Sequence, residues 1–291
     1  MDRRKFIKRG ALGAAAVAAT GSVNAKSESN TVKNEKLGFN HIPSAKPETI
    51  KNNMMKAIIH RANTRGHANH GWLDTHHTFS FASYYNPERM HFGALRVLND
   101  DRVNGGMGFG RHPHDNMEII SIPLEGALEH KDSMGNTHTI KKNDVQVMSA
   151  GTGIFHSEKN KSDNDEVRFL QIWVYPNKKN VTPRYDQIAF DPNDRLNKLQ
   201  QVASPNAEDA GVWMHQDAWF YLSDLEAGKS VIHNINKSEN GVYLFVLEGD
   251  VKVGEHTLGK RDGMGITQAT QINIETTKGA EVLLMEVPMS I

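Results

Sequence analysis

Short apolar runs rich in β-branched and aromatic residues recur along this chain from about residue 57 onward. Residues 119–122, 145–148 and 169–175 are three such runs, and Gly135-Asn136 and Asn143-Asp144 are turn signals between them. Such side chains pack well on a pleated surface, so runs of this length favour strands. The pattern predicts an all-β protein made of antiparallel barrels or sandwiches.

An internal repeat divides the β-rich region into two parts. Leu124-Glu125-Gly126 recurs as Leu247-Glu248-Gly249, each time after an apolar run, and Asn143-Asp144 has a counterpart at Arg261-Asp262. A repeat of this kind indicates two copies of one structural unit. We therefore expect two antiparallel β-barrels packed together in one chain, over residues 57–186 and 187–291.

The first of these units contains two i, i+2 pairs of potential metal ligands, His112 with His114 and His156 with Glu158. On a strand this spacing sends both side chains to one face, so two such strands inside a barrel direct three imidazoles and one carboxylate to one point. The chain has no cysteine, which leaves histidine and carboxylate as the ligand types. This set suits a divalent transition metal.

The ligand set indicates an open site rather than a closed structural one. Three histidines and one carboxylate leave about one or two positions free on the metal for substrate or dioxygen, whereas structural zinc usually takes four ligands that include cysteine. The carboxylate has two candidates at this stage. Glu118 shares strand parity with His112 and His114, although it lies in an apolar strand where it could instead orient a ligand histidine.

Several segments resemble the pirin family of the cupin superfamily, in particular the bacterial pirins with quercetinase activity. The first cupin motif is nearly reproduced around His112, one residue off at Gly126, and the second appears around His156 without its usual proline. The resemblance runs from about Ile59 to the C-terminus, in the family's order and spacing. The matching segments are residues 73–81, 92–103, 108–114, 124–126, 130–136, 148–158 and 171–173.

The resemblance implies a bicupin fold of two jelly-roll barrels and one divalent ion per chain. Iron is the expected ion, and manganese, nickel, cobalt and copper accept the same ligands. In many cupins the glutamate at the Glu118 position ligates, whereas the pirin pattern carries over to His112, His114, His156 and Glu158. The implied reaction is dioxygenolytic opening of a flavonol such as quercetin or a related phenolic, with Glu158 as the base. The alternative is a non-enzymatic, metal-dependent regulatory or interaction protein.

The second barrel lacks these ligands. Counting from its repeat as one counts in the first barrel leads to Ile235, Lys237, Ile274 and Thr276 at the ligand positions. We expect this barrel to be metal-free and to shape the mouth of the first, with nearby His233 in a structural role.

Further histidines precede the first motif, namely His67, His70, His76, His77 and His91. Because neighbours on a strand point to opposite faces, His76 and His77 do not share one site, and we expect a single metal centre. Four tryptophans can line an aromatic pocket or pack in the core, and the sequence does not separate these fates. They are Trp72, Trp173, Trp213 and Trp219.

The N-terminus has the features of an export signal. Residues 2–8 resemble a twin-arginine motif, an alanine-rich run follows, and Val23-Asn24-Ala25 is a small-residue cleavage site. We expect a signal peptide over residues 1–25, a flexible polar linker over 26–56 and a periplasmic monomer without a membrane span. The formal net charge of +0 disfavours nucleic acid as a partner.

Overall fold

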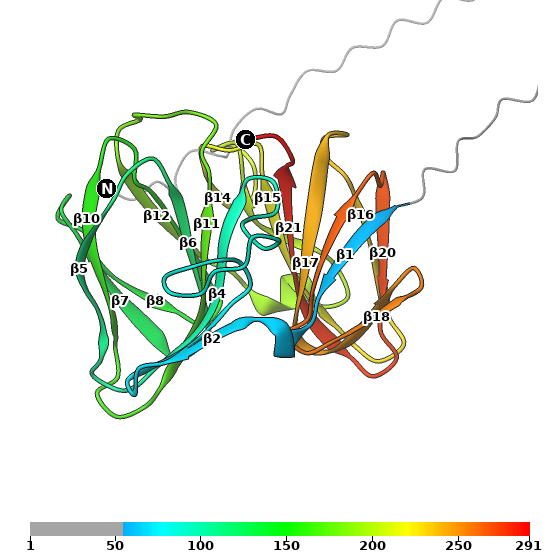
Figure 1. Ribbon diagram of the computed structural model, residues 1–291, viewed down its shortest axis with the longest axis horizontal. Coiled ribbons are helices and arrows are strands. Elements are labelled where there is room, and N and C mark those ends of the chain that lie inside the picture. The colour runs from blue at the N-terminus through cyan, green and yellow to red at the C-terminus, as the bar shows by residue number, and fades with distance from the viewer. Residues whose placement is uncertain (1–54) are drawn as a thin grey trace, which may run out of the picture. The chain divides into compact units, whose positions relative to one another are not determined.

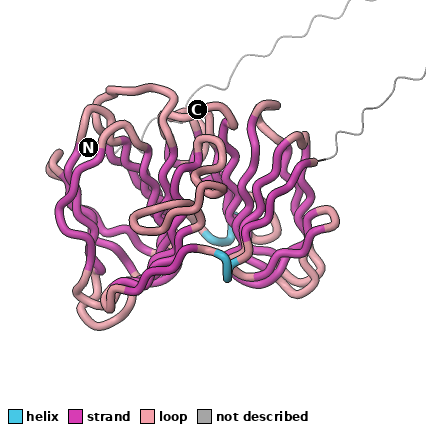
Figure 2. The backbone as a smooth tube through the Cα atoms, viewed as in Figure 1, coloured by secondary structure: helices cyan, strands magenta, loops and turns pink. Residues whose placement is uncertain are grey.

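The computed structural model describes residues 55–291, in which regular structure is β-strand apart from two short 3-10 turns (Figure 2). These turns are η1 (Ala62–Thr64) and η2 (Pro192–Arg195). The all-β prediction is therefore confirmed. The signal peptide expected over residues 1–25 and almost all of the linker expected over 26–56 lie outside the described residues. Among residues 55–291, no helix is long and apolar enough to cross a membrane.

The first barrel is built from a 7-stranded and a 4-stranded sheet (Figure 1, from blue at β2 to yellow-green at β12). The larger sheet has the order β12-β9-β6-β11-β4-β3-β2 and the smaller one β5-β10-β7-β8. Their strands are β2 (Gly66–Asn69), β3 (Leu73–His77), β4 (Leu95–Val103), β5 (Gly108–His114), β6 (Glu118–Glu125), β7 (Ala127–Asp132), β8 (Thr137–Lys141), β9 (Asp144–Ser149), β10 (Ile154–Asn160), β11 (Val167–Val174) and β12 (Arg184–Ala189).

The second barrel is formed by a 10-stranded sheet whose main path is β1-β19-β17-β21-β15-β13-β14 (Figure 1, yellow to red, with β1 in blue). Off this path, β16 pairs with β20, and β18 pairs with the end of β17. The strands are β1 (Lys56–His60), β13 (Gln200–Ser204), β14 (Val212–Trp213), β15 (Trp219–Leu225), β16 (Ser230–Asn234), β17 (Asn240–Val253), β18 (His256–Gly259), β19 (Gly263–Thr267), β20 (Gln271–Glu275) and β21 (Ala280–Pro288).

Strand β1 is the point where the chain departs from the simple order expected from the sequence. The sequence predicts that the first barrel begins at residue 57, but β1 pairs antiparallel with β19 of the second barrel, with Ile58 opposite Gly265. The chain then crosses to the first barrel at β2. No local pattern marks this exchange, because any short strand can cover an exposed sheet edge and only the tertiary fold decides which one.

The two repeat glycines occupy matching turns in the two barrels. Gly126 has a φ of 74° and Gly249 a φ of 77°, which is the left-handed region that favours glycine. At Gly249 an added Cβ would overlap the carbonyl oxygen of Gly279, so a side chain is also excluded by space.

The second repeat pair also occupies equivalent turns. Asn143 and Arg261 both adopt positive φ, at 71° and 66°. In each copy the following aspartate then accepts a backbone hydrogen bond, Asp144 Oδ2 from Lys141 at 2.8 Å and Asp262 Oδ2 from Gly259 at 3.1 Å. The two copies of the sequence repeat therefore form turns with the same backbone geometry.

The barrels share a continuous apolar core. Strands β6, β9, β17 and β21 are buried on both faces over most of their length, whereas β16 and β20 alternate between exposed and buried residues. One cluster of buried side chains joins residues of the first barrel, such as Leu95 and Ile172, to Phe245 and Met285 of the second. Strands between two barrels lose water on both sides, which removes the alternating pattern of a half-exposed strand.

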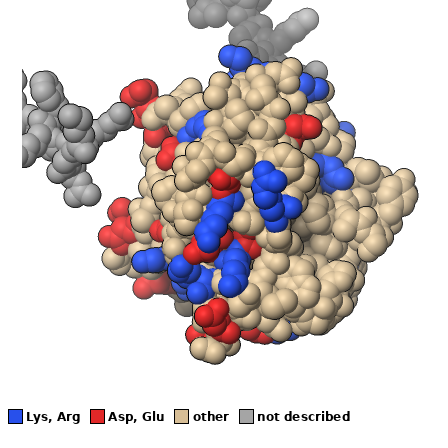
Figure 3. Space-filling view, turned by 90° about the vertical axis from the view of Figure 1, so that its left-hand side faces the viewer, with Lys and Arg blue, Asp and Glu red and all other residues tan. Residues whose placement is uncertain are grey.

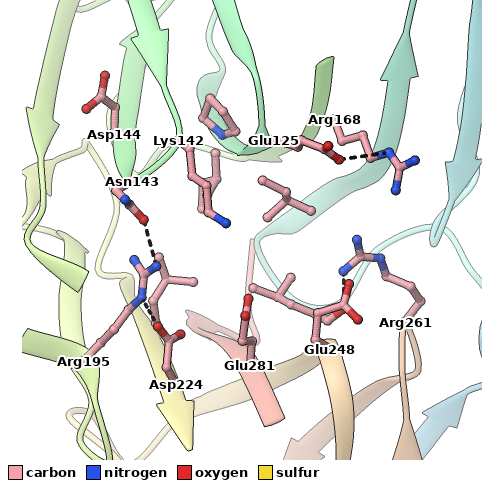
Figure 4. A pocket seen from close by; sticks show the side chains of 15 residues that line it. Glu125, Lys142, Asn143, Asp144, Arg168, Arg195, Asp224, Glu248, Arg261 and Glu281 are labelled. Atoms are coloured by element: carbon pink, nitrogen blue, oxygen red, sulfur yellow. Dashed lines mark hydrogen bonds and ion pairs between the residues drawn. The ribbon is translucent and has the colours of Figure 1, made fainter. Parts of the chain in front are cut away.

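A charged pocket of about 300 Å³ lies where the two copies of the repeat meet (Figure 4). Buried Arg195 lies at one wall of the pocket and donates one hydrogen bond to Asn143 Oδ1 and one to Asp224 Oδ2, each at 2.8 Å. Arg168 lies 3.4 Å from Glu125 at the opposite wall. These paired charges belong to the seam between the barrels, because none of the histidines predicted to bind metal lines this pocket.

Candidate metal centre

Three histidines converge inside the first barrel from two adjacent antiparallel strands. His112 and His114 come from β5 and His156 from β10, and His156 stands directly opposite His112. The three ring centroids are 4.4 to 4.8 Å apart. One nitrogen from each ring lies within 4.8 Å of the other two. The i, i+2 spacing on β5 and the pairing with β10 together produce this geometry.

The three imidazoles suit a divalent transition metal. His156 is 2% exposed, and neither of its ring nitrogens has a hydrogen-bond partner among residues 55–291. Such an arrangement costs about 1–3 kcal/mol for a buried polar atom unless a ligand satisfies it. The Nδ1 atom of His112 donates to the carbonyl oxygen of Gly110 at 2.8 Å. Its Nε2 is therefore the nitrogen that carries the free lone pair.

Burial also keeps the histidines in the form that binds metal. Desolvation, assisted by the neighbouring histidines, lowers the pKa of His156 to about 2 and that of His114 to about 4. Both imidazoles are therefore neutral at pH 7, and a neutral imidazole is the metal-ligating species.

Glu158 lies inside the same barrel and is 1% exposed. Its carboxylate reaches from β10 toward the larger sheet, where Oε1 accepts from the Ser121 hydroxyl at 3.2 Å and Oε2 from the Gln171 amide at 3.1 Å. Burial raises the pKa of this carboxyl, and nearby His112 and the two hydrogen bonds lower it in part. A group held in this way stays in one orientation and has an increased affinity for a proton.

Glu118, the other candidate carboxylate, is engaged elsewhere. Its Oε2 accepts from the Ser149 hydroxyl at 2.7 Å and from the backbone amide of His215 at 3.2 Å. The second contact ties strand β6 to a segment of the second barrel. Glu118 therefore has structural partners, Ser149 and the backbone of His215, that its position along the strand did not predict.

A cavity of about 640 Å³ opens at His112 and His114. Its apolar wall contains Phe81, Phe109, Leu73 and Trp173, and the Trp173 ring lies edge-on to His114 with centroids 4.9 Å apart. Of the four tryptophans, Trp173 thus faces the site. The complete lining is Ala68, His70, Leu73, Thr75, His77, Phe81, Ala82, Ser83, Asn99, Asp101, Phe109, Gly110, His112, His114, Gln171 and Trp173.

Asp101 is a cavity residue that the sequence analysis did not single out. It is 3% exposed, and its Oδ1 has no hydrogen-bond partner in the part of the chain that the structure describes. Burial raises its pKa to about 7, with added repulsion from the charges of Asp100 and Glu158. Asp101 and Asn99 share strand parity on β4 and both line the cavity. The sequence shows that Asn99 and Asp101 would share one face of a strand. Only the structure shows that this face of β4 lines the cavity.

His76 and His77 lie on opposite faces of β3, as the alternation of side chains along a strand predicts. His77 lines the cavity and its Nδ1 donates to Asn99 Oδ1 at 2.8 Å, while His76 stands on the opposite face beside His67. In the second barrel, His233 Nε2 donates to the buried Glu286 carboxylate at 2.9 Å. This buried contact with Glu286 fits the structural role that was expected for His233 from the sequence.

The outer side of the first barrel carries acidic and basic side chains intermixed (Figure 3). Glu129 on β7 pairs with Lys131 on the same strand and with Lys161, which follows the end of β10, at 2.6 and 2.8 Å. Because such pairs place opposite charges side by side, this surface does not form a strongly acidic or basic patch.

Comparison with known proteins agrees with this architecture. The profile of the Pirin family matches residues 58–174, and that of the quercetinase C-terminal cupin domain matches residues 201–287. The chain is 44% identical over 230 residues to the quercetin 2,3-dioxygenase of Escherichia coli K12, covering 79% of this chain and 98% of that protein. It is 40% identical over 222 residues to a pirin-like protein of Caulobacter vibrioides, covering 76% and 95% of the two chains.

A solved structure shows the same fold. The crystal structure of the bacterial pirin YhhW from Escherichia coli in complex with nickel(II) has a TM-score of 0.76 and 42% identity, covering 81% of this chain and all of that one. The identity and coverage of these relatives, together with the two cupin barrels and the histidine centre, show that this chain belongs to the pirin family of bicupin proteins.

Proposed function

We propose that this protein is a metal-dependent dioxygenase of the quercetin 2,3-dioxygenase type, acting on a flavonol or a related phenolic. The observation that carries the proposal is the apolar-walled cavity of about 640 Å³ that is lined by His112 and His114, two of the three clustered histidines. Its volume lies in the range of small-molecule sites, roughly 300–1,000 Å³. A relative with 44% identity bears the name of this activity.

His112, His114, His156 and Glu158 would hold one divalent ion. Iron is the ion we propose, and the nickel in a pirin relative's crystal structure shows that this family also accepts another. When bound, the ion supplies Lewis acidity that favours the deprotonated 3-hydroxyl of a flavonol and a place for dioxygen beside the ring.

The protein's own groups position the substrate and move its proton. Phe81 and Trp173 flank the cavity with aromatic surface suited to a flat phenolic ring and exclude water from it. Glu158 accepts the proton of the 3-hydroxyl, while Ser121 and Gln171 hold its carboxylate in place. In the overall reaction the flavonol gains both atoms of dioxygen and loses one carbon as carbon monoxide, which leaves a phenolic ester.

The cavity also weighs against the non-enzymatic alternative. A protein that reports the state of its metal through a surface has no use for a deep apolar cavity at the metal, whereas a small aromatic substrate requires one. We therefore favour the enzyme over the regulatory or interaction protein.

The test measures oxygen uptake and quercetin loss by the metal-depleted protein after reloading with single ions. We expect turnover with at least one ion and its loss in His112→Ala. Glu158→Gln should abolish turnover while quercetin binding stays measurable, and Glu118→Gln, a matched buried carboxylate, should keep most of the activity. Full activity in Glu158→Gln would refute the base assignment. No turnover with any ion, although the wild type binds one equivalent more than His112→Ala, would refute the proposed reaction.

We also propose export to the periplasm by the twin-arginine route, on the basis of residues 1–25. This route carries folded proteins, so the metal would be inserted before the protein meets competing copper and zinc, which raw affinity favours.

A further inference from the structure

A second group of potential metal ligands lies on the hairpin formed by β2 and β3. His67 stands directly opposite His76 across the two strands, and the rings are stacked with centroids 4.4 Å apart. Asp74 Oδ1 lies 2.9 Å from His67 Nε2 and 3.8 Å from His76 Nδ1. One ligand atom from each residue lies within 4.8 Å of the other two.

We propose that His67, Asp74 and His76 form a second site, which binds a divalent ion of the zinc, nickel or copper class. Two imidazole nitrogens and one carboxylate oxygen suit these ions. The side chains of His67 and His76 are 51% and 37% exposed, so water can complete the coordination. The antiparallel register already holds the two rings together, which lowers the ordering cost of binding.

The contacts of Asp74 favour a metal site over a simple ion pair. Its Oδ2 accepts from Arg102 at 3.1 Å and from the amide of Asn69 at 3.3 Å, whereas the polar contacts of its Oδ1 among the described residues are with the two histidines. One oxygen is thus oriented by neighbouring groups while the other points at the imidazoles, which is how second-layer contacts orient a ligating carboxylate. Metal binding would replace a single hydrogen bond, that between His67 and Asp74.

The position of this site connects it to the catalytic cavity. Leu73, Thr75 and His77 on β3 line the cavity, and strand alternation places Asp74 and His76 on the opposite face of the same strand. Ala68 lines the cavity from β2, next to His67. An ion bound outside would join β2 to β3 and so brace one wall of the cavity.

The test is a stoichiometry measurement on the full, untagged, metal-depleted protein, using nickel(II) and zinc(II) in equilibrium dialysis with metal analysis. We expect His112→Ala to remove the first centre and leave one bound equivalent of at least one of these ions. Adding His67→Ala and His76→Ala to this variant should remove that equivalent, whereas adding His256→Ala, a control on β18, should leave it. Asp74→Asn, which keeps the side-chain volume, should weaken binding of the same equivalent at least tenfold.

The result does not depend on enzymatic activity, so it separates this proposal from the proposed function. Retention of the equivalent after removal of His67 and His76, or no bound nickel or zinc in His112→Ala, would overturn the second site. Circular dichroism of each variant establishes that the β fold is intact before the equivalents are counted.

Discussion

The buried cavity residue Asp101 should make the free energy of unfolding depend on pH. Its ordinary pKa is 3.8, and burial raises it to about 7 in the folded state. Between these values the unfolded chain releases the proton while the folded protein keeps it. The contribution of protonated Asp101 to stability is therefore complete below about pH 4 and is lost as the pH rises through about 7.

Asp101→Asn removes this titration with little change in side-chain shape. From pH 5 to pH 7 the wild type loses about 1.4 kcal/mol of unfolding free energy per pH unit through this group, and the loss stops above its folded pKa. The difference in unfolding free energy between variant and wild type should thus shift by about 3 kcal/mol in favour of the variant between pH 5 and pH 8.

Urea denaturation of the metal-depleted proteins at pH 5, 6, 7 and 8, followed by tryptophan fluorescence, measures this difference. The low pKa values of His114 and His156 also change stability with pH, but they act equally on both proteins and cancel. Asp163→Asn, whose carboxylate is 84% exposed, is the control and should show no pH-dependent shift. A difference for Asp101→Asn that stays constant between pH 5 and pH 8 would refute the reasoning.

Three further predictions test the cavity wall, the repeat turn and the proposed export signal. Trp173→Ala should raise the KM for quercetin about tenfold, equivalent to about 1.4 kcal/mol of lost contact, with unchanged metal content by elemental analysis; an unchanged KM would contradict its role in the wall. Gly249→Ala should lower the unfolding free energy by more than about 2 kcal/mol, and by more than Gly126→Ala, in urea denaturation, because its Cβ would overlap a backbone carbonyl. Replacing Arg3 and Arg4 by lysine should retain the protein in the cytoplasm on cell fractionation, and unimpaired export would exclude the twin-arginine route.

The sequence by itself determined the features that depend on local geometry. Strand alternation follows from the covalent structure of an extended chain, so the spacing of His112, His114 and His156 was enough to predict a shared face. The repeated Leu-Glu-Gly segments predicted two barrels because such a repeat indicates two copies of one structural unit. In the structure both repeat glycines have a positive φ, which glycine adopts without a steric cost.

Only the tertiary structure decided which distant residues share a space. It brought Asp101 to the cavity, engaged Glu118 with Ser149 and the second barrel, and paired β1 with β19. It also set His67 against His76 and Asp74 on the outer face of the cavity wall. These arrangements depend on which strands become neighbours, and strand pairing is decided by the burial of the whole sheet and the closure of its edges rather than by any local run of residues.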